Sequence, residues 1–208
     1  MKNLTDQQKG SLLAFVAVVF ITPDSLFIRL SNLDTWGLVF YRGIIPFFTV
    51  FFGMLLIYKL NFFKILFNSG VLGIIYILTF SITNITFVVS IQNTNVANTL
   101  VMIATAPMLS AIFGAIFLKE PPDRKTLISI IITFFAIIYI FFDSLKVGNL
   151  YGDVLGFITA FGLALGAITI RSAKTKNLVP AAVVGKLFVA SFALFFIESF
   201  VLIDRDLF

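Results

Sequence analysis

The segment GLVFYRGIIPFFTVFFGMLLIY, residues 37–58, contains a single charged residue, Arg42. A helix crosses the hydrocarbon core of a bilayer with about 20 apolar residues, so this segment predicts a transmembrane helix. An arginine at the centre of such a helix costs roughly 2.5–3.5 kcal/mol on insertion scales. Arg42 is therefore expected either to reach the lipid headgroups or to have a partner inside the protein.

The composition of the whole chain agrees with this segment. Of the 208 residues, 60% are hydrophobic and 12% are charged, whereas soluble domains are about 45–50% apolar and about 25% charged. Because backbone amides in lipid must be satisfied within their own segment, helices are expected rather than strands. The sequence predicts an all-α polytopic membrane protein with seven transmembrane helices, at about residues 10–30, 37–58, 70–90, 98–118, 126–142, 151–171 and 179–203.

The chain has no cysteine and no histidine. Disulfides, zinc and haem sites and histidine-assisted catalysis all need these residues. We therefore expect no metal, no cofactor and no enzymatic activity. The net charge is +5, but the basic residues lie in short connections between apolar segments, which argues against a nucleic-acid partner. The expected partners are the lipid bilayer and a small-molecule substrate, and formation of a homo-oligomer stays open.

The distribution of lysine and arginine predicts the orientation of the chain. The connections on one side carry Lys2, Lys9, Lys59, Lys64, Lys119, Arg124, Lys125, Arg171, Lys174 and Lys176. The connections on the other side carry only Arg29, Lys146 and Arg205. Because cytoplasmic connections are enriched in lysine and arginine, the N-terminus is expected in the cytoplasm.

Two parts of the sequence resemble each other. When residues 10–30 are set above residues 152–172, the glycine at the start and the arginine at the penultimate position coincide. With two extra residues in the second connection, Arg42 then aligns with Lys186. Helices one and two would therefore correspond to helices six and seven, which gives five helices per unit. Since five is odd, the second unit would cross the membrane in the opposite direction, as in the inverted repeats of many secondary transporters.

Three motifs resemble one known family. The segment NTNVANTLVMIATAPMLSAIFGAIFLKE, residues 93–120, combines small and polar residues with a mid-helix proline and a small-residue face that ends in Glu120. GLVFYRG carries Arg42, and SLFIRL carries Arg29. These motifs are similar to the fourth, second and first helices of EamA-type transporters of the drug/metabolite transporter superfamily. The TPDS at residues 22–25 departs from that family, which often has a Trp-Gly pair there.

The resemblance covers essentially the whole chain and implies a ten-helix fold made of two inverted five-helix repeats. Residues 1–147 would form the first repeat, and residues 148–208 would form two helices of the second. Because three helices would then be missing, a truncated product or fragment is expected in preference to a genuine seven-helix variant.

The function that the resemblance implies is transport of small polar metabolites, such as amino-acid-like or nucleotide-like compounds or organic ions. The carrier would work by alternating access across a bacterial-type cytoplasmic (inner) membrane. The alternative is a non-transporting, truncated or half-unit membrane protein that needs a partner to complete the bundle.

Five polar residues in apolar surroundings are candidates for substrate binding or gating: Asp24, Arg42, Asn84, Asn98 and Lys186. Asp24 lies about 9 Å below the outer end of its helix, close in depth to Arg42, so we expect an ion pair that faces the bundle interior. Otherwise Arg42 and Lys186 reach the headgroups and only anchor their helices. Asn84 either links helices or lines a cavity, and Asn98 belongs either to a polar loop or to an outer vestibule.

Three prolines are expected to bend helices, because each removes one backbone hydrogen bond. These are Pro23, Pro46 and Pro107. The bend at Pro107 is either a static packing feature or a hinge used in transport.

Overall fold

The computed structural model describes residues 6–21, 23–31, 33–59, 61–147 and 149–197, and this part of the chain is helical without strands. The helices are α1 (Asp6–Ile21), α2 (Asp24–Leu30), α3 (Thr35–Tyr58), α4 (Asn61–Asn93), α5 (Val96–Ile103), α6 (Ala106–Phe117), α7 (Arg124–Val147), α8 (Leu150–Ala173) and α9 (Val179–Ala193). The predicted all-α class is confirmed.

Four helical segments of the described chain are long and apolar enough to cross a membrane. They are α3, α4, the pair α5 and α6 taken together, and α8, while α9 is apolar but only 15 residues long. A multi-pass protein in a lipid bilayer follows from these segments. The predicted spans at 10–30, 126–142 and 179–203 stay predictions, and so do the seven-helix count and the ten-helix repeat.

Two of the predicted continuous helices are interrupted. The helix expected at 10–30 ends at Ile21 and resumes at Asp24, with Pro23 as the N-cap of α2. The helix expected at 98–118 is divided between α5 and α6, and Pro107 lies in the first turn of α6. The single continuous helix predicted at 10–30 is therefore wrong. The span predicted at 98–118 is confirmed as the candidate span Val96–Phe117, but it is interrupted between α5 and α6. A proline has no amide for the preceding turn, and its ring crowds that turn's carbonyl.

The other two long apolar segments behave differently. Pro46 lies inside α3, which continues from Thr35 to Tyr58 across it. In α4 the regular helical backbone is broken at Gly70, which has φ 59° and ψ −142°. The predicted span at 70–90 therefore begins at this break.

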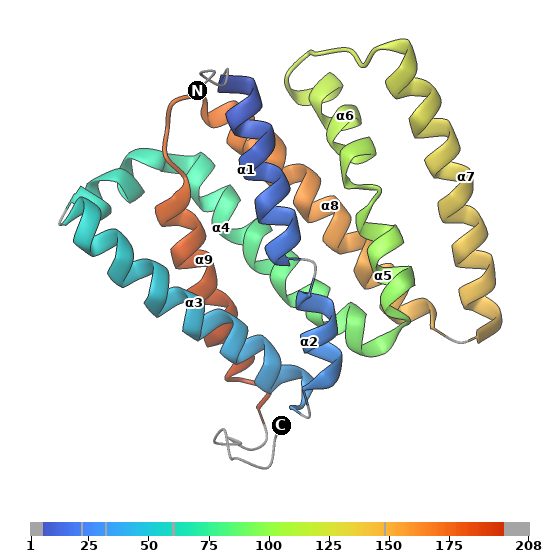
Figure 1. The fold of residues 1–208 in the computed structure, drawn as a ribbon, viewed down its shortest axis with the longest axis horizontal. Coiled ribbons are helices and arrows are strands. Elements are labelled where there is room, and N and C mark those ends of the chain that lie inside the picture. Colours follow the sequence, from blue (N-terminus) through green and yellow to red (C-terminus); the bar gives the residue numbers. More distant parts are fainter. Residues whose placement is uncertain (1–5, 22, 32, 60, 148, 198–208) are drawn as a thin grey trace.

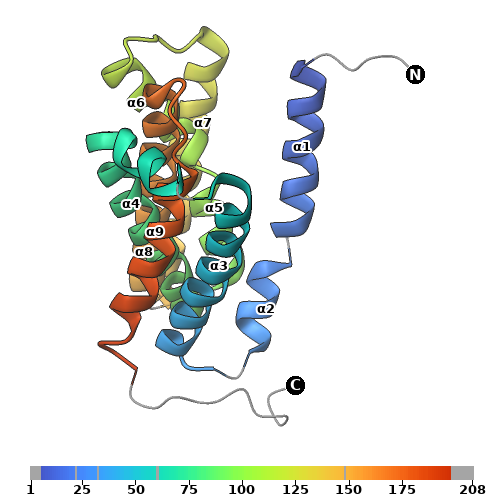
Figure 2. The same ribbon diagram turned by 90° about the vertical axis from the view of Figure 1, so that its left-hand side faces the viewer.

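Helix α4 lies at the centre of the fold. It packs against α8 and α9, α3 packs on α9, and α5 and α6 pack on α8, as can be followed in Figure 1. Figure 2 shows α1 set apart from the other helices. Its apolar side chains are accordingly exposed, with Leu13 at 70% and Phe15 at 67%. Such a surface is suited to contact with acyl chains.

If α1 with α2, and α5 with α6, are each taken as one interrupted segment, successive segments run in opposite directions (Figure 1). In Figure 1, the C-terminal ends of α3, α6 and α8 lie along the upper and left edge of the view. The turns before α3 and between α4 and α5 lie along the lower side of the view. We call these the lysine-rich end and the opposite end, because the first group carries most of the described basic residues of the connections.

Three lysines at the lysine-rich end adopt a backbone conformation that favours glycine. Lys59, Lys119 and Lys174 have φ of 50°, 58° and 51°, and among the described residues no other non-glycine has a positive φ. Each lies just after a helix ends, at α3, α6 and α8 respectively. A side chain in such a conformation costs of order 1–3 kcal/mol.

Candidate functional site

Asp24 and Arg42 form the ion pair expected from their depths. Arg42 Nη2 donates to Asp24 Oδ2 at 2.8 Å, and Nη1 donates to the other carboxylate oxygen. The side chains are 27% and 29% exposed for Arg42 and Asp24 respectively. The Arg42 guanidinium also lies over the ring of Phe87, with its central carbon 5.7 Å from the ring centroid. A two-pronged pair of this kind fixes orientation as well as charge.

The helix break before Asp24 positions the carboxylate of this pair. Because α2 restarts after Pro23, Asp24 falls in the first turn of the new helix. The backbone of α2 is held nearby through Ile28, which is buried in a core shared with α3 and α4. The departure from the family at TPDS thus supplies the acid that meets Arg42.

Lys186 has a neutral partner. Its ammonium donates to Asn84 Oδ1 at 2.6 Å and lies 5.4 Å from the ring centroid of Phe80. Asn84 in turn donates through Nδ2 to the backbone carbonyl of Phe80 at 2.7 Å. Phe80, Asn84 and Phe87 are four and three residues apart, so they share one face of α4. Both cations therefore lie along the same face of this helix.

A close approach of α3 and α9 brings the two cations together. A Cβ atom added to Gly43 would lie 2.7 Å from the backbone nitrogen of Ala190 and 2.9 Å from the carbonyl oxygen of Lys186. Arg42 and Lys186 each stand seven residues after the first residue of their helices, which is about 10 Å along the axis. Lys186 is close enough to Arg42 and Asp24 for their charges to interact. We call Asp24, Arg42, Asn84 and Lys186 the central cluster.

Asn98 lies in a different place. It points to Asp153 of α8, with Nδ2 at 3.4 Å from Oδ2, and Thr94 Oγ1 donates to Asp153 Oδ1 at 2.6 Å. Ser90 joins this group through the Thr99 hydroxyl at 2.8 Å and the carbonyl of Gly152 at 2.7 Å. We call Ser90, Thr94, Asn98, Thr99 and Asp153 the Asp153 cluster. It connects α4, α5 and α8 at the opposite end of the bundle.

The burial of the Asp153 cluster was not expected from the sequence. Asp153 is 0% exposed, and so are Ser90 and Thr99. Asp153 stands in the first turn of α8, where an acid is common for its interaction with the helix dipole alone. The only signal in the sequence is the glycine before it: a Cβ at Gly152 would lie 2.6 Å from Thr94 Cβ, so this glycine permits the contact.

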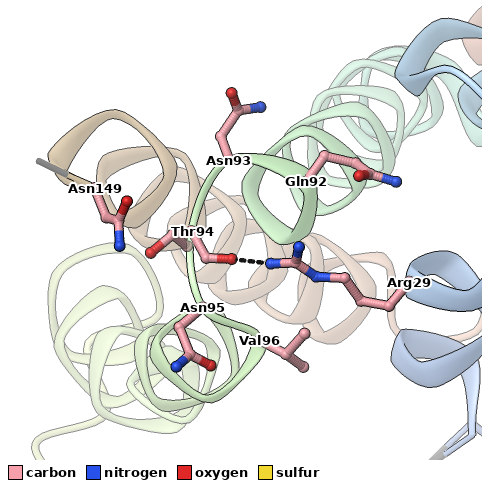
Figure 3. A pocket seen from close by; sticks show the side chains of 7 residues that line it. All are labelled: Arg29, Gln92, Asn93, Thr94, Asn95, Val96 and Asn149. Atoms are coloured by element: carbon pink, nitrogen blue, oxygen red, sulfur yellow. Dashed lines mark hydrogen bonds between the residues drawn. The ribbon is translucent and has the colours of Figure 1, made fainter.

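A polar pocket of about 580 Å³ opens beside the Asp153 cluster. Figure 3 shows its lining, in which the Arg29 guanidinium donates to the backbone carbonyl of Thr94. The remaining lining residues are Gln92, Asn93, Asn95, Val96 and Asn149. Thr94 therefore contacts α2 through its carbonyl and α8 through its hydroxyl. The lining of the pocket is mainly polar.

A second pocket, of about 340 Å³, lies between the α5–α6 break and α7. It is lined by Ala104, Pro107, Met108, Asp123, Lys125, Thr126, Ser129, Ile130 and Thr133. At its rim the hydroxyl and backbone amide of Thr126 hydrogen-bond Asp123, which holds the pKa of this carboxyl below its usual value. Pro107 thus borders a space rather than a packed helix contact.

The comparisons with known proteins agree with the motifs. Residues 8–142, more than half of the chain, match the profile of the EamA-like transporter family. No curated protein and no solved structure matches the chain. Members of this family are transporters rather than enzymes. The chain belongs to the EamA-like transporter family of the drug/metabolite transporter superfamily.

Proposed function

We propose that this chain transports a small polar metabolite with an anionic group, by alternating access across a bacterial-type cytoplasmic membrane. The observation that carries the proposal is the central cluster. Four helices bring two cations, one carboxylate and one amide together in an apolar bundle. Ionisable groups at membrane depth are costly, and they commonly mark substrate or ion pathways.

The charge balance of the cluster favours an anion. Asp24 neutralises Arg42, whereas the partner of Lys186 is the uncharged amide of Asn84. One positive charge is therefore left over. A carboxylate or phosphate on the substrate would supply it with a charge-assisted hydrogen bond, which is about twice as strong as a neutral one. The rings of Phe80 and Phe87 leave an apolar wall beside the two cations.

The inverted repeat supports alternating access. We infer that residues 1–147 and 148–208 belong to two repeats, because Arg42 and Lys186 occupy equal positions in α3 and α9. Figure 1 shows α1 and α8, the first helices of the two units, running in opposite directions. Repeats of this kind place the substrate at their interface and expose it to each side in turn.

We place the lysine-rich end in the cytoplasm, because positive connections are retained on that side. The chain has no cysteine, so single-cysteine variants can be labelled without further changes. Asn61→Cys at the start of α4 is expected to resist a membrane-impermeant maleimide in intact cells, and Asn149→Cys before α8 is expected to react. Labelling of both variants from the same side would contradict the inverted topology.

The substrate class is tested by ligand-dependent thermal stability of the purified chain. Carboxylates, phosphate esters, organic cations and neutral amides are compared, and a rise in Tm is expected only with the anions. Lys186→Gln is expected to abolish the rise. Lys176→Gln, which removes the same charge from an exposed connection, is expected to keep it. Counterflow of the best radiolabelled compound in proteoliposomes then tests transport itself.

Two results would overturn this proposal. A rise in Tm with cations alone would contradict the anionic substrate. If Lys186→Gln and Lys176→Gln lose binding equally, the central cluster is not the site that binds the anion.

A further inference from the structure

The three lysines with positive φ also share their exposure and their place just after a helix end. Lys59, Lys119 and Lys174 are all exposed and all lie at the lysine-rich end. They follow α3, α6 and α8, three of the apolar helices that form the bundle. These helices end at separate points along the upper and left edge of Figure 1. Because each lysine closely follows the end of one of them, the three lysines belong to separate helix ends.

Glycine would fit these positions with less strain. Gly70 adopts φ 59° and ψ −142° inside α4, and Lys59 adopts nearly the same pair, 50° and −138°. Glu120 follows Lys119 in the chain, and its backbone amide donates to the carbonyl of Gly114 at 3.2 Å. The residue that follows a helix end with a positive φ is usually glycine. A lysine at each site therefore keeps a side chain at a conformational cost.

The described protein gives these ammonium groups no partner of their own. No described side chain or carbonyl forms an ion pair or hydrogen bond with the side chain of Lys59, Lys119 or Lys174. Glu120, the acid next to Lys119, pairs instead with Arg171. The helix dipole does not account for Lys174 either, because Arg171 already stands in the last turn of α8.

We propose that Lys59, Lys119 and Lys174 form a collar that binds the phosphate groups of anionic phospholipids. Each lysine stands where an apolar helix ends, which is the level of the headgroups for a helix that spans the bilayer. A flexible ammonium attracts the phosphate of an anionic lipid in the adjacent leaflet.

The test compares two triple variants of the full chain in lipid nanodiscs. The collar variant carries Lys59→Gly, Lys119→Gly and Lys174→Gly, which remove three charges and relieve the backbone strain. The control variant carries Lys64→Gln, Lys125→Gln and Lys176→Gln, which remove three exposed charges from the same end. Tm is measured in phosphatidylcholine and in phosphatidylglycerol, and bound lipid is counted by native mass spectrometry.

The wild type is expected to gain Tm in phosphatidylglycerol and to retain this lipid in the mass spectrum. The collar variant is expected to lose most of both while remaining at least as stable as the wild type in phosphatidylcholine. The control variant is expected to keep most of both. If the collar and control variants lose the Tm gain and the bound lipid equally, lipid binding depends only on the total charge of this end, and the proposal is overturned. A Tm gain of the same size from inorganic phosphate in phosphatidylcholine would overturn it in favour of a free anion.

Discussion

The central cluster and the Asp153 cluster are both polar groups inside an apolar bundle, yet they are built differently. The central cluster uses long charged side chains that are partly exposed, with about a quarter of the Arg42 side chain accessible. The Asp153 cluster uses short side chains. Four of them, Ser90, Thr94, Thr99 and Asp153, are buried and connected at 2.6–2.8 Å, while Asn98 is partly buried and makes a longer contact. Short, buried and paired groups fix the packing of helices, whereas accessible charges are able to exchange partners with a ligand.

The largest expected effect is on stability at the Asp153 cluster. Asp153→Ala removes the acceptor of the Thr94 hydroxyl in a site without solvent, and we expect a loss of about 3 kcal/mol in the free energy of unfolding. Asp153→Asn keeps an oxygen of the same shape and should recover a large part of this loss. Equilibrium unfolding in mixed detergent micelles measures both. Equal losses for alanine and asparagine would contradict the role given to the Thr94 contact.

Backbone contact is tested next, at one glycine in each region. Gly152→Ala and Gly43→Ala each place a Cβ within 2.7 Å of atoms that include backbone, and we expect each to cost about 1–3 kcal/mol. Gly53→Ala is the matched control, since no atom lies within 4 Å of its added Cβ and alanine favours a helix. Thermal unfolding ranks the three variants. If Gly53→Ala is as unstable as Gly152→Ala and Gly43→Ala, the close contacts at Gly152 and Gly43 do not explain the loss of stability.

Exchanging the charges of Asp24 and Arg42 tests whether their ion pair stabilises the fold. Asp24→Arg and Arg42→Asp alone each place two like charges side by side, and we expect each to lower Tm and the yield of inserted protein. The double exchange restores opposite charges and is expected to recover most of both. Insertion is measured by membrane fractionation and fluorescence-detected size exclusion. A double variant no better than the single variants would show that the contact does not hold α2 and α3 together.

The smallest expected effect on stability is at Lys186. Lys186→Met removes the charge and keeps a flexible apolar stem, so we expect a change within about 1 kcal/mol, because the amide of Asn84 stays accessible. Equilibrium unfolding under the conditions used for Asp153→Ala gives the comparison directly. A loss as large as that of Asp153→Ala would make Lys186 a structural residue and remove the contrast between the two regions.

Much of this arrangement could be predicted from the sequence, and the part that could not has a physical reason. Segment length predicted the four long apolar segments, and depth along the helices predicted the Asp24–Arg42 pair. Depth says nothing about direction around a helix axis, so the contact of Lys186 with Asn84 could not be derived. The Asp153 cluster was missed because an acid in the first turn of a helix resembles an ordinary partner of the helix dipole.

The helix breaks were missed for another reason. Residues 10–30 and 98–118 are mostly apolar in spite of the TPDS at 22–25, and hydropathy carries no information on backbone hydrogen bonds. Pro23 and Pro107 were expected to bend their helices, but a bend and a complete interruption have the same sequence pattern. Neighbouring side chains decide between them.

The glycines on either side of α9 have a consequence for the ligand. Gly43 lies against its backbone at Ala190, and Gly185 of α9 itself lies against the ring of Phe80, where an added Cβ would be 2.9 Å away. Because of these two close contacts, α9 has little freedom to rotate about its axis. The Lys186 ammonium is therefore oriented before a ligand binds. If the substrate is the anion proposed above, its binding would order the protein less, and the conformational entropy saved in this way would come from two residues that have no side chain.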